Sequence, residues 1–501
     1  MVLVLLYIVA YSARSIHAYT IGTTLFDLAT FEQSFWNATH GTLFFSSLEG
    51  DISHFGRHFS PIFYLLLPIY ALHRDPTTLL VLQSVALGLA AIPLYLFARR
   101  RLGQSPAALG LAALYLASPA VHDINIVNEF HELAFAVPLL FLAFYAAEAR
   151  RWRLYGLAVV GALMGKEDVA LTVAALGIYL ALVQRERRIG LITAAGSVAW
   201  FLIVVEWIMP ALRGPLGPVP FLGYDYLGEG IFGIARGVVT NPRELWQVMS
   251  SQPKQDYLHW LFLPVAFVAL LAPEVLLITA PGLLLILASA YPPTFAIFER
   301  YVAPILPFVY IATVIGIARL RDAGRAIAWL RERTGHRDDT QRPALLPRAV
   351  MTLALVALVA SSAVYAQVHL RKYPDRLRYT DEPSPHAATA MAIAADIPEH
   401  ATVAIEDHRL LVRAAHRRHL YYLSGSSPAT DYLVVDRAVG PITNASPEER
   451  ATALDRVIEG GEYLLIRCED GIALYGSRAA YQRDAAWFAG LTPSSGMACE
   501  P

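Results

Sequence analysis

The sequence predicts a mainly α-helical, polytopic membrane protein, in which a helix bundle of about eleven spans precedes a small extracytoplasmic α/β domain. Composition is the first reason. Hydrophobic residues make up 56% of the 501 residues and charged residues only 16%, whereas about a quarter of a soluble globular chain is charged. The second reason is that the apolar residues gather in long runs. Beyond residue 366 the pattern changes, because the apolar runs become short and strand-like.

The spans are predicted from the apolar runs, each interpreted as a helix that crosses the bilayer. These runs are Met1–Ala18, Leu79–Phe97, Ala107–Ala120, Leu133–Ala147, Leu154–Met164, Val169–Val183, Leu191–Met209, Leu258–Leu271, Val275–Ala290, Val302–Ala318 and Val350–Val364. A further run, Ile62–Leu72, is too short to cross comfortably, so we interpret it as a re-entrant or interfacial helix. Residues 1–366 then form a transmembrane domain with a long first external loop, 19–78, and residues 367–501 form a tail.

The orientation is predicted from four groups of arginines that follow or precede spans. They are Arg99–Arg101, Arg150–Arg153, Arg185–Arg188 and the basic stretch Arg319–Arg348. If Ile62–Leu72 does not span, all four groups fall on one side, and an excess of arginine marks the cytoplasmic side. We therefore expect a multi-pass protein of the plasma (cytoplasmic) membrane with its tail outside. Topology also explains these basic groups without a nucleic-acid partner.

Ionisable residues from distant parts of the chain meet on the predicted external face. Charges at or within a membrane are costly, so they tend to be paired and to mark function. Several such segments on one face predict a single water-facing cavity. The predicted site residues are Asp27, Glu32, Arg57 and His58 in the first loop, Glu129, His131 and Glu132 in the second, Lys166, Glu167 and Asp168 in the third, and Glu299, Arg300 and Tyr301 in a later one.

Each cluster also has a plainer explanation. Loop carboxylates often serve solubility, and Lys166-Glu167-Asp168 could be a buried structural ion pair, since its loop is almost absent. Glu129, His131 and Glu132 have the side chains of a metal site, yet a hydrogen-bonded loop cluster is equally ordinary. His54 and His58 have the spacing of two ligands on one helical face, but Gly56 and Pro61 weaken the helix prediction. The metal ligands therefore remain unknown.

The tail predicts a small α/β domain at about residues 385–478. Its predicted strands are Thr402–Ile405, Tyr421–Leu423, Tyr432–Val435, Tyr463–Ile466 and Ile472–Tyr475, and its predicted helices are Ala387–Ala395 and Pro447–Ile458. It has no glycine-rich phosphate loop and no nucleophile elbow. Acceptor docking, capping of the cavity and a purely structural role all stay open. The two cysteines, Cys468 and Cys499, allow one disulfide or two free thiols.

Three strings of the sequence carry a family resemblance. They are Phe26–Asn37, His54–Pro61 and Lys166–Asp168. Together they resemble the membrane-protein family called domain of unknown function 2079, and the likeness covers nearly the whole chain. That family is similar in architecture to glycosyltransferases of the GT-C class. The GT-C resemblance implies many spans, a long first external loop with an acidic residue near the first span, and a soluble domain after the last span. It also implies a sugar donor carried on a polyprenyl phosphate.

Carried onto this sequence, the GT-C resemblance implies roles for individual residues. Asp27 matches the acidic position and becomes the expected catalytic base. Glu299-Arg300-Tyr301, followed by Pro304 and Pro307, is similar to the His/Arg-Tyr-x-x-Pro segment that lies near the lipid phosphate in several GT-C enzymes. Arg300, Lys166 or Arg57 would then neutralise the phosphate. The Trp-Trp-Asp signature is missing, which argues against oligosaccharyltransferase activity.

The expected function is therefore transfer of a sugar from a polyprenyl-phosphate-linked donor to an unknown acceptor outside the cytoplasm. Membrane lipids and the donor are the expected partners, and a divalent metal is compatible with the sequence but not required by it. The alternative is a transporter or flippase for a polar or lipid-linked substrate. Transporters often contain paired halves, and the sequence shows no convincing internal repeat.

Overall fold

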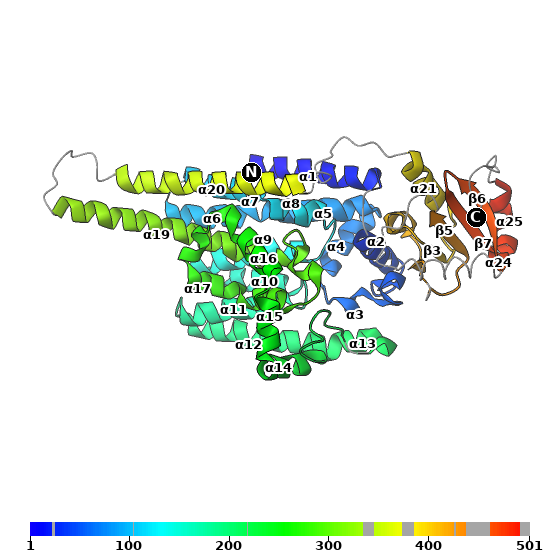
Figure 1. Cartoon of the computed structure of the whole chain (residues 1–501), viewed down its shortest axis with the longest axis horizontal. Coiled ribbons are helices and arrows are strands. Elements are labelled where there is room, and N and C mark those ends of the chain that lie inside the picture. The colour runs from blue at the N-terminus through cyan, green and yellow to red at the C-terminus, as the bar shows by residue number, and fades with distance from the viewer. Residues whose placement is uncertain are drawn as a thin grey trace.

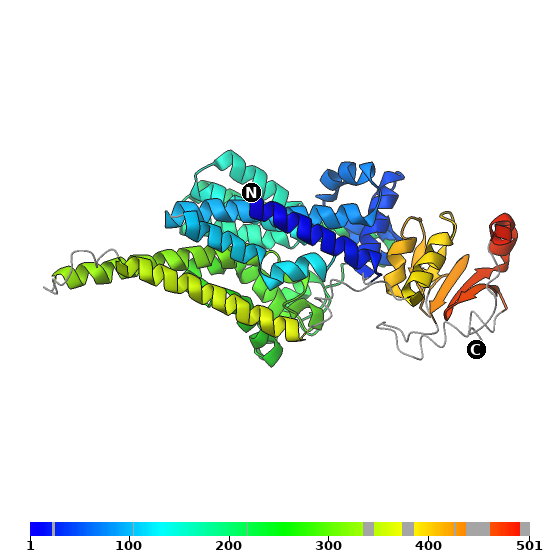
Figure 2. The same ribbon diagram turned by 90° about the horizontal axis from the view of Figure 1, so that it is seen from above.

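The computed structural model contains a helical bundle along its long axis and a small α/β domain at one end (Figure 1). The structure describes residues 1–22, 26–103, 105–217, 219–333, 345–372, 385–424, 427–436 and 461–490. Viewed from above, the helices α1, α19 and α20 run roughly along the long axis (Figure 2). The predicted class is confirmed: the chain is mostly helical and its small sheet lies near the C-terminus.

Helices occupy the predicted apolar runs. The helices up to the tail are α1 Val2–Thr20, α2 Phe26–Thr39, α3 His54–Arg57, α4 Phe63–Leu72, α5 Pro76–Leu89, α6 Ala91–Leu102, α7 Ser105–Leu116, α8 Pro119–Ile126, α9 Leu133–Glu148, α10 Trp152–Leu163, α11 Val169–Leu182, α12 Arg187–Ile203, the π-helical turn η2 Val204–Ile208, α13 Met209–Arg213, α14 Gly230–Thr240, α15 Pro242–Met249, α16 Gln252–Phe262, α17 Pro273–Leu276, α18 Ala280–Ala288, α19 Leu306–Arg333 and α20 Leu345–Lys372. A two-stranded ribbon, β1 Phe45–Ser46 with β2 Ile52–Ser53, lies between α2 and α3.

Four helical segments of the described chain are long and apolar enough to cross a bilayer by themselves. They are Val2–Thr20, Pro76–Leu102, Arg187–Leu216 and Ala349–Val368, and the bent pair Pro106–Leu116 with Pro119–Ile126 would make a fifth. The remaining apolar helices are shorter, so the count of about eleven spans stays a prediction. The helix α4 has 10 residues, about 15 Å at 1.5 Å per residue, and cannot cross a core of about 30 Å.

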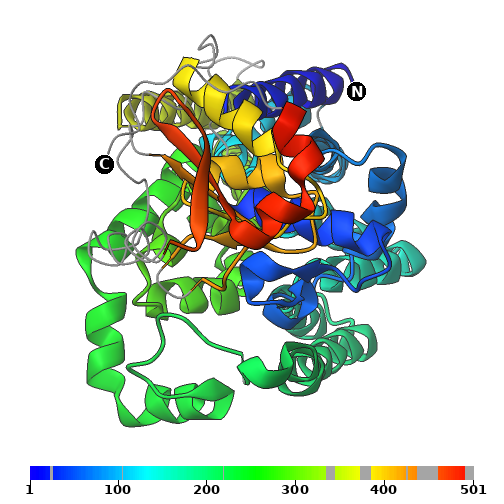
Figure 3. The ribbon, with the colours of Figure 1, turned by 90° about the vertical axis from the view of Figure 1, so that its right-hand side faces the viewer.

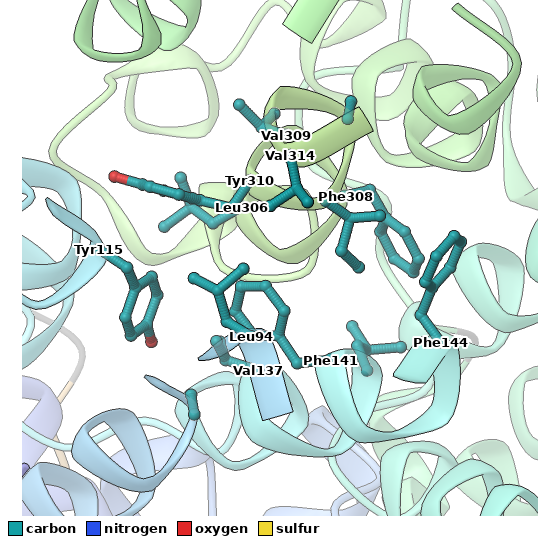
Figure 4. Packing of buried hydrophobic residues seen from close by; sticks show 14 of the residues in the cluster. Leu94, Tyr115, Val137, Phe141, Phe144, Leu306, Phe308, Val309, Tyr310 and Val314 are labelled. Carbon is teal, nitrogen blue, oxygen red and sulfur yellow. The ribbon is translucent and has the colours of Figure 1, made fainter. Parts of the chain in front are cut away.

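The bundle core is built by side chains from α6, α7, α9 and α19 (Figure 4). Leu94, Val137 and Phe141 are fully buried there. The rings of Tyr115 and Tyr310 meet edge to face, with centroids 5.5 Å apart. Aromatic pairs favour this geometry because the positive edge of one ring faces the negative face of the other. Such close packing matters in a bilayer, where helix association cannot depend on the hydrophobic effect.

Two glycines allow α11 and α12 to touch through their backbones. A Cβ added at Gly177 would lie 2.5 Å from the nitrogen of Ala194, and one added at Gly190 would lie 2.5 Å from the nitrogen of Ala181. Small residues at helix contacts are typical of membrane bundles because they let backbones approach closely. The contact fixes α11, which directly follows Lys166–Asp168, against α12.

Replacing Gly177 by alanine should therefore destabilise the protein. We expect Gly177→Ala to lower stability by about 1–3 kcal/mol, because the added methyl forces the helices apart. Thermal unfolding in detergent measures the effect. Gly196→Ala is the matched control on the same helix pair, since no heavy atom lies within 4 Å of its added Cβ. That variant should be as stable as the parent or more so; equal melting of both variants would contradict the close contact.

The arginine groups lie at one end of the bundle, as predicted. Arg321 on α19 donates to the carbonyl of Leu102 at the end of α6, at 2.9 Å. At the α9–α10 and α11–α12 turns, Arg150 pairs with Glu186 at 2.8 Å. Part of the predicted basic stretch Arg319–Arg348 lies outside the described residues. The α/β domain occupies the opposite end of the molecule (Figure 1).

The five predicted tail strands are all present and form one mixed sheet of order β4-β3-β5-β7-β6. The elements are α21 Pro385–Asp396, β3 Val403–Ile405, α22 His408–Leu411, β4 Leu420–Tyr422, β5 Tyr432–Asp436, β6 Tyr463–Glu469, β7 Ile472–Ser477, α24 Arg478–Arg483 and α25 Ala485–Gly490. The predicted helix Pro447–Ile458 and Cys499 lie outside the described residues. Cys468 is disulfide-bonded and is therefore not a free thiol.

The tail domain packs on the region 19–78 that follows α1, and the views along and across the long axis agree on this (Figures 1 and 3). Gln33 of α2 donates to the carbonyl of Arg417 at 3.1 Å. Ser47 donates to the carbonyl of Leu420 at 2.6 Å. Because these groups are buried, the hydrogen bonds satisfy polar atoms that water cannot reach. The tail therefore fixes the position of α2, the helix whose first turn carries Asp27.

Candidate active site

One cavity of about 390 Å³ lies between the region 19–78, the α10–α11 turn, α12, α18 and the segment before α19. Its polar wall consists mainly of residues predicted from the sequence: Asp27, Arg57, His58, Lys166, Glu167, Asp168, Arg300 and Tyr301. Its other wall is apolar and includes Leu171, Phe201, Val205, Met209, Val219, Phe221, Leu222, Leu285, Ile286, Pro304 and Ile305. The predicted convergence of the charged segments on one pocket is thus present in the structure, and the pocket is amphiphilic.

Asp27 lies in the first turn of α2 and faces the cavity. Its carboxylate is 3.1 Å from the guanidinium of Arg300 and 3.3 Å from Nε2 of His131. The Asp27 side chain is 41% exposed, whereas that of His131 is only 2% exposed. Burial, together with the nearby cations Arg300 and Lys166, lowers the pKa of His131. His131 is therefore neutral at pH 7, and it lies next to Asp27 as an uncharged imidazole.

Arg300 is held by its backbone as well as by its charge. Its amide donates to the side-chain oxygen of Asn128 at 3.1 Å, and the amide group of Asn128 donates to the carbonyl of Phe298 at 2.7 Å. The guanidinium also lies 3.3 Å from Glu299. Arg300 thus sits between two carboxylates, Asp27 and Glu299, with its chain position fixed by the α8–α9 connection. Glu299 itself is not among the cavity-lining residues.

The α10–α11 turn supplies a second cation. Lys166 is buried, 3.8 Å from Asp168, and its ammonium lies 5.7 Å from the ring centre of Tyr301. Burial opposes its charge, but Asp168, Glu167 and Glu132 together raise the pKa of Lys166. The lysine is therefore charged at neutral pH. A buried cation next to an aromatic face is well placed to receive an anion.

Glu167 joins this turn to the segment that follows α3. Its carboxylate accepts from the backbone amide of Phe59 at 3.0 Å and lies 3.1 Å from Nδ1 of His58. Glu167 therefore fixes His58 at the edge of the cavity. His54, in contrast, pairs with Glu49 at 3.0 Å. The two histidines have different partners, and the described residues contain no group of three or more His, Cys, Asp or Glu side chains placed to hold a metal.

The other predicted residues lie behind the cavity wall or away from it. Glu129 accepts from the backbone amide of Leu28 at 3.3 Å and so supports the first turn of α2. Glu132 is buried and contributes negative charge near Lys166. Glu32 is fully buried away from the cavity, where it accepts from Tyr70 at 2.5 Å and lies 2.7 Å from His416 of the tail. The structure therefore does not bring Glu32 to the same pocket as Asp27.

Several cavity residues were not predicted from the sequence. The largest group is the linker between α13 and α14, where Val219, Phe221, Leu222 and Tyr224 line the apolar wall. Hydrogen bonds tie this linker to α18, since Tyr224 donates to the carbonyl of Leu285 at 2.6 Å. The signal in the sequence is the glycine- and proline-rich stretch 214–223. Such a stretch identifies a loop but not its position beside Arg300.

The family model described as "Predicted membrane protein (DUF2079)" matches residues 17–474. The chain belongs to the DUF2079 family. The three strings that suggested this family contribute Asp27, Arg57, His58 and Lys166–Asp168 to one cavity. No curated protein matches the chain significantly.

Among solved structures, this DUF2079 protein is similar to ArnT from Cupriavidus metallidurans bound to undecaprenyl phosphate. The match has 14% identity and a TM-score of 0.48, and covers 94% of this chain and 97% of ArnT. It is also similar to the archaeal oligosaccharyltransferase AglB from Archaeoglobus fulgidus in complex with an inhibitory peptide and a dolichol-phosphate. That match has 12% identity and a TM-score of 0.44, and covers 86% of this chain and 69% of AglB.

Proposed function

We propose that this protein is a membrane glycosyltransferase that takes a sugar from a polyprenyl-phosphate-linked donor. The observation that carries the proposal is the amphiphilic cavity, which joins a carboxylate and several cations to an apolar wall. A lipid phosphate has the same two parts: an anionic group that pairs with arginine and lysine, and an apolar chain. A volume of about 390 Å³ lies in the usual range of ligand pockets, about 300–1,000 Å³.

The proposed reaction follows from the placement of Asp27 and Arg300. The acceptor hydroxyl attacks the anomeric carbon of the sugar, the bond from that carbon to the phosphate oxygen breaks, and the lipid phosphate leaves. Asp27 takes the acceptor's proton, while Arg300, Lys166 and Arg57 stabilise the negative charge of the departing phosphate. Without ligand, Arg300 pairs with Asp27 at 3.1 Å. A bound phosphate competes for this guanidinium and so releases the carboxylate to act as a base.

We further propose that the cavity opens outside the cytoplasm. The arginine groups lie at the opposite end of the bundle from the tail (Figure 1), and clustered arginine is typical of the cytoplasmic side. The disulfide at Cys468 supports the same placement, because such bonds persist in oxidising compartments. The lipid phosphate would then be held at the outer surface of the plasma membrane.

Lipid binding tests the proposal directly. In nanodiscs, undecaprenyl phosphate should raise the melting temperature, since a ligand at 100 times its Kd stabilises by about 2.7 kcal/mol. Undecaprenol, which lacks the phosphate, should have a much smaller effect. Equal effects of the two lipids would contradict a phosphate site. A sugar-charged undecaprenyl phosphate should then lose its sugar in the presence of protein; phosphate binding without any sugar release would favour the flippase alternative.

A further inference from the structure

The helices α14 and α15, joined at Asn241, form a bent helical hairpin at the rim of the molecule, and both run across the direction of the spans. Viewed down the long axis, both are seen lengthwise in green at the lower left (Figure 3), and they lie alongside the bundle, not beyond its end (Figure 1). Helices that lie in the plane of a membrane have this orientation when the spans define the membrane normal. The hairpin connects the α12–α13 segment to α16.

The apolar side of α14 faces outward. Phe232 is 74% exposed and Val239 is 78% exposed, and these two positions lie seven residues apart on one helical face. The exposed Arg236 lies between them on this otherwise apolar face, and its long side chain can carry the charge to the headgroup level. In water, an amphipathic helix turns this face to the protein core. Here the face turned to the protein is the one with glycines: Gly237 is buried, and a Cβ added to it would clash with the carbonyl of Leu227.

The second helix exposes a tryptophan. Trp246 of α15 is 69% exposed, and the exposed polar residues Glu244 and Gln247 lie further around that helix. Tryptophan is enriched at membrane–water interfaces, where its ring is buried among lipids and its N–H stays wet. Arg236 of α14 and Arg243 are both exposed. Such side chains attract the phosphates of lipid headgroups.

The start of α14 packs against a helical segment that is apolar enough to cross the bilayer. Ile231 at the start of α14 packs on the buried cluster Val204, Val205 and Met209 at the end of α12. The neighbouring Trp207 is 66% exposed. Arg187–Leu216 is one of the segments apolar enough to span a bilayer. Only 28% of its 18-residue apolar stretch is buried within the protein. This contact with a span identifies the bilayer as the occupant of the apolar face.

We propose that the α14–α15 hairpin lies in the headgroup region of the leaflet on the cavity side, with the apolar face of α14 and Trp246 inserted among the lipid chains. The hairpin follows the linker Val219–Tyr226, part of which lines the apolar wall of the cavity. Tyr226 donates to the carbonyl of Ala288 at 2.7 Å, which ties the linker to α18. Anchoring the hairpin at the bilayer surface therefore holds this wall at the level of the lipid headgroups. The membrane contact does not depend on sugar transfer.

Electron paramagnetic resonance of the full chain tests this contact. Single cysteines at 232 and 239 are spin-labelled in nanodiscs of phosphatidylcholine and phosphatidylglycerol, and the parent chain gives the background labelling. Gln247→Cys, on the polar side of α15, is the matched control. Oxygen concentrates among lipid chains and a nickel chelate stays in water. We expect the ratio of oxygen to chelate accessibility to be severalfold higher at 232 and 239 than at 247.

Two other results would overturn the inference. Preferential access of the chelate to 232 and 239 would place the hairpin in water. Low access of both reagents, together with dipolar coupling between labels on two molecules, would identify a second copy of the chain as the occupant. All labelled positions are exposed, so the substitutions leave the fold intact. Undecaprenyl phosphate is absent from the measurement, so failure of the glycosyltransferase proposal leaves this result unaffected.

Discussion

Asp27→Asn should abolish sugar transfer while the protein stays folded. Asparagine keeps the size of the side chain but accepts no proton, and general-base catalysis is typically worth about a hundredfold to ten-thousandfold. The Asp27 side chain is 41% exposed, so its ion pair adds little to stability. The measurement is sugar loss from a polyprenyl-phosphate donor per folded molecule, with thermal unfolding recorded in parallel. Full turnover by a folded Asp27→Asn variant would reject Asp27 as the base, and Asp168 would be tested next.

Glu32→Gln is the control for this experiment, because it makes the same carboxylate-to-amide change on the same helix. Glu32 is buried and joins Tyr70 of α4 to His416 of the tail. Loss of a buried charged hydrogen-bond partner costs about 1.5–3 kcal/mol. We therefore expect this variant to melt at a lower temperature and to keep its turnover per folded molecule. The two variants thus separate a chemical role from a structural one.

Replacing Arg300 should weaken the binding of undecaprenyl phosphate. Arg300→Gln removes the guanidinium that faces the cavity, and a hydrogen bond to a charged group contributes about 1.5–3 kcal/mol, or roughly a tenfold to hundredfold change in Kd. Arg300→Lys should fall between the two, because lysine keeps the charge but not the bidentate geometry. The Kd is measured by titration of protein in nanodiscs with the lipid phosphate.

Arg319→Gln provides the matched control for Arg300. Arg319 is also an arginine paired with a carboxylate, at 2.7 Å from Glu274, but it lies at the opposite end of the bundle. Its replacement should leave the Kd unchanged. If both variants weakened binding equally, the effect would reflect net charge alone. Unchanged binding by Arg300→Gln would remove Arg300 from the phosphate site, and Lys166 and Arg57 would remain as the cations to test.

The sequence by itself determined the class of protein, the arginine-rich end and the five strands of the tail. All three features follow from composition and from local sequence patterns. Such a pattern is about 20 residues long for a span and a few residues long for a strand. The sequence also identified most of the residues in the polar wall of the cavity. Charged residues next to apolar spans are energetically costly and therefore rare, so they stand out in the sequence. The family strings added Asp27 and Lys166 as residues of one site, without stating how they meet.

Only the tertiary structure decided which of these residues share the cavity. Asp27 and Glu32 lie five positions apart on α2. Their side chains therefore point in directions that differ by roughly 140° around the helix axis. Asp27 therefore faces Arg300, while Glu32 faces Tyr70 and the tail. The apolar wall at Val219–Leu222 and the outward apolar face of α14 were equally hidden from the sequence. Neither follows from local pattern, because both depend on which surfaces distant helices leave open.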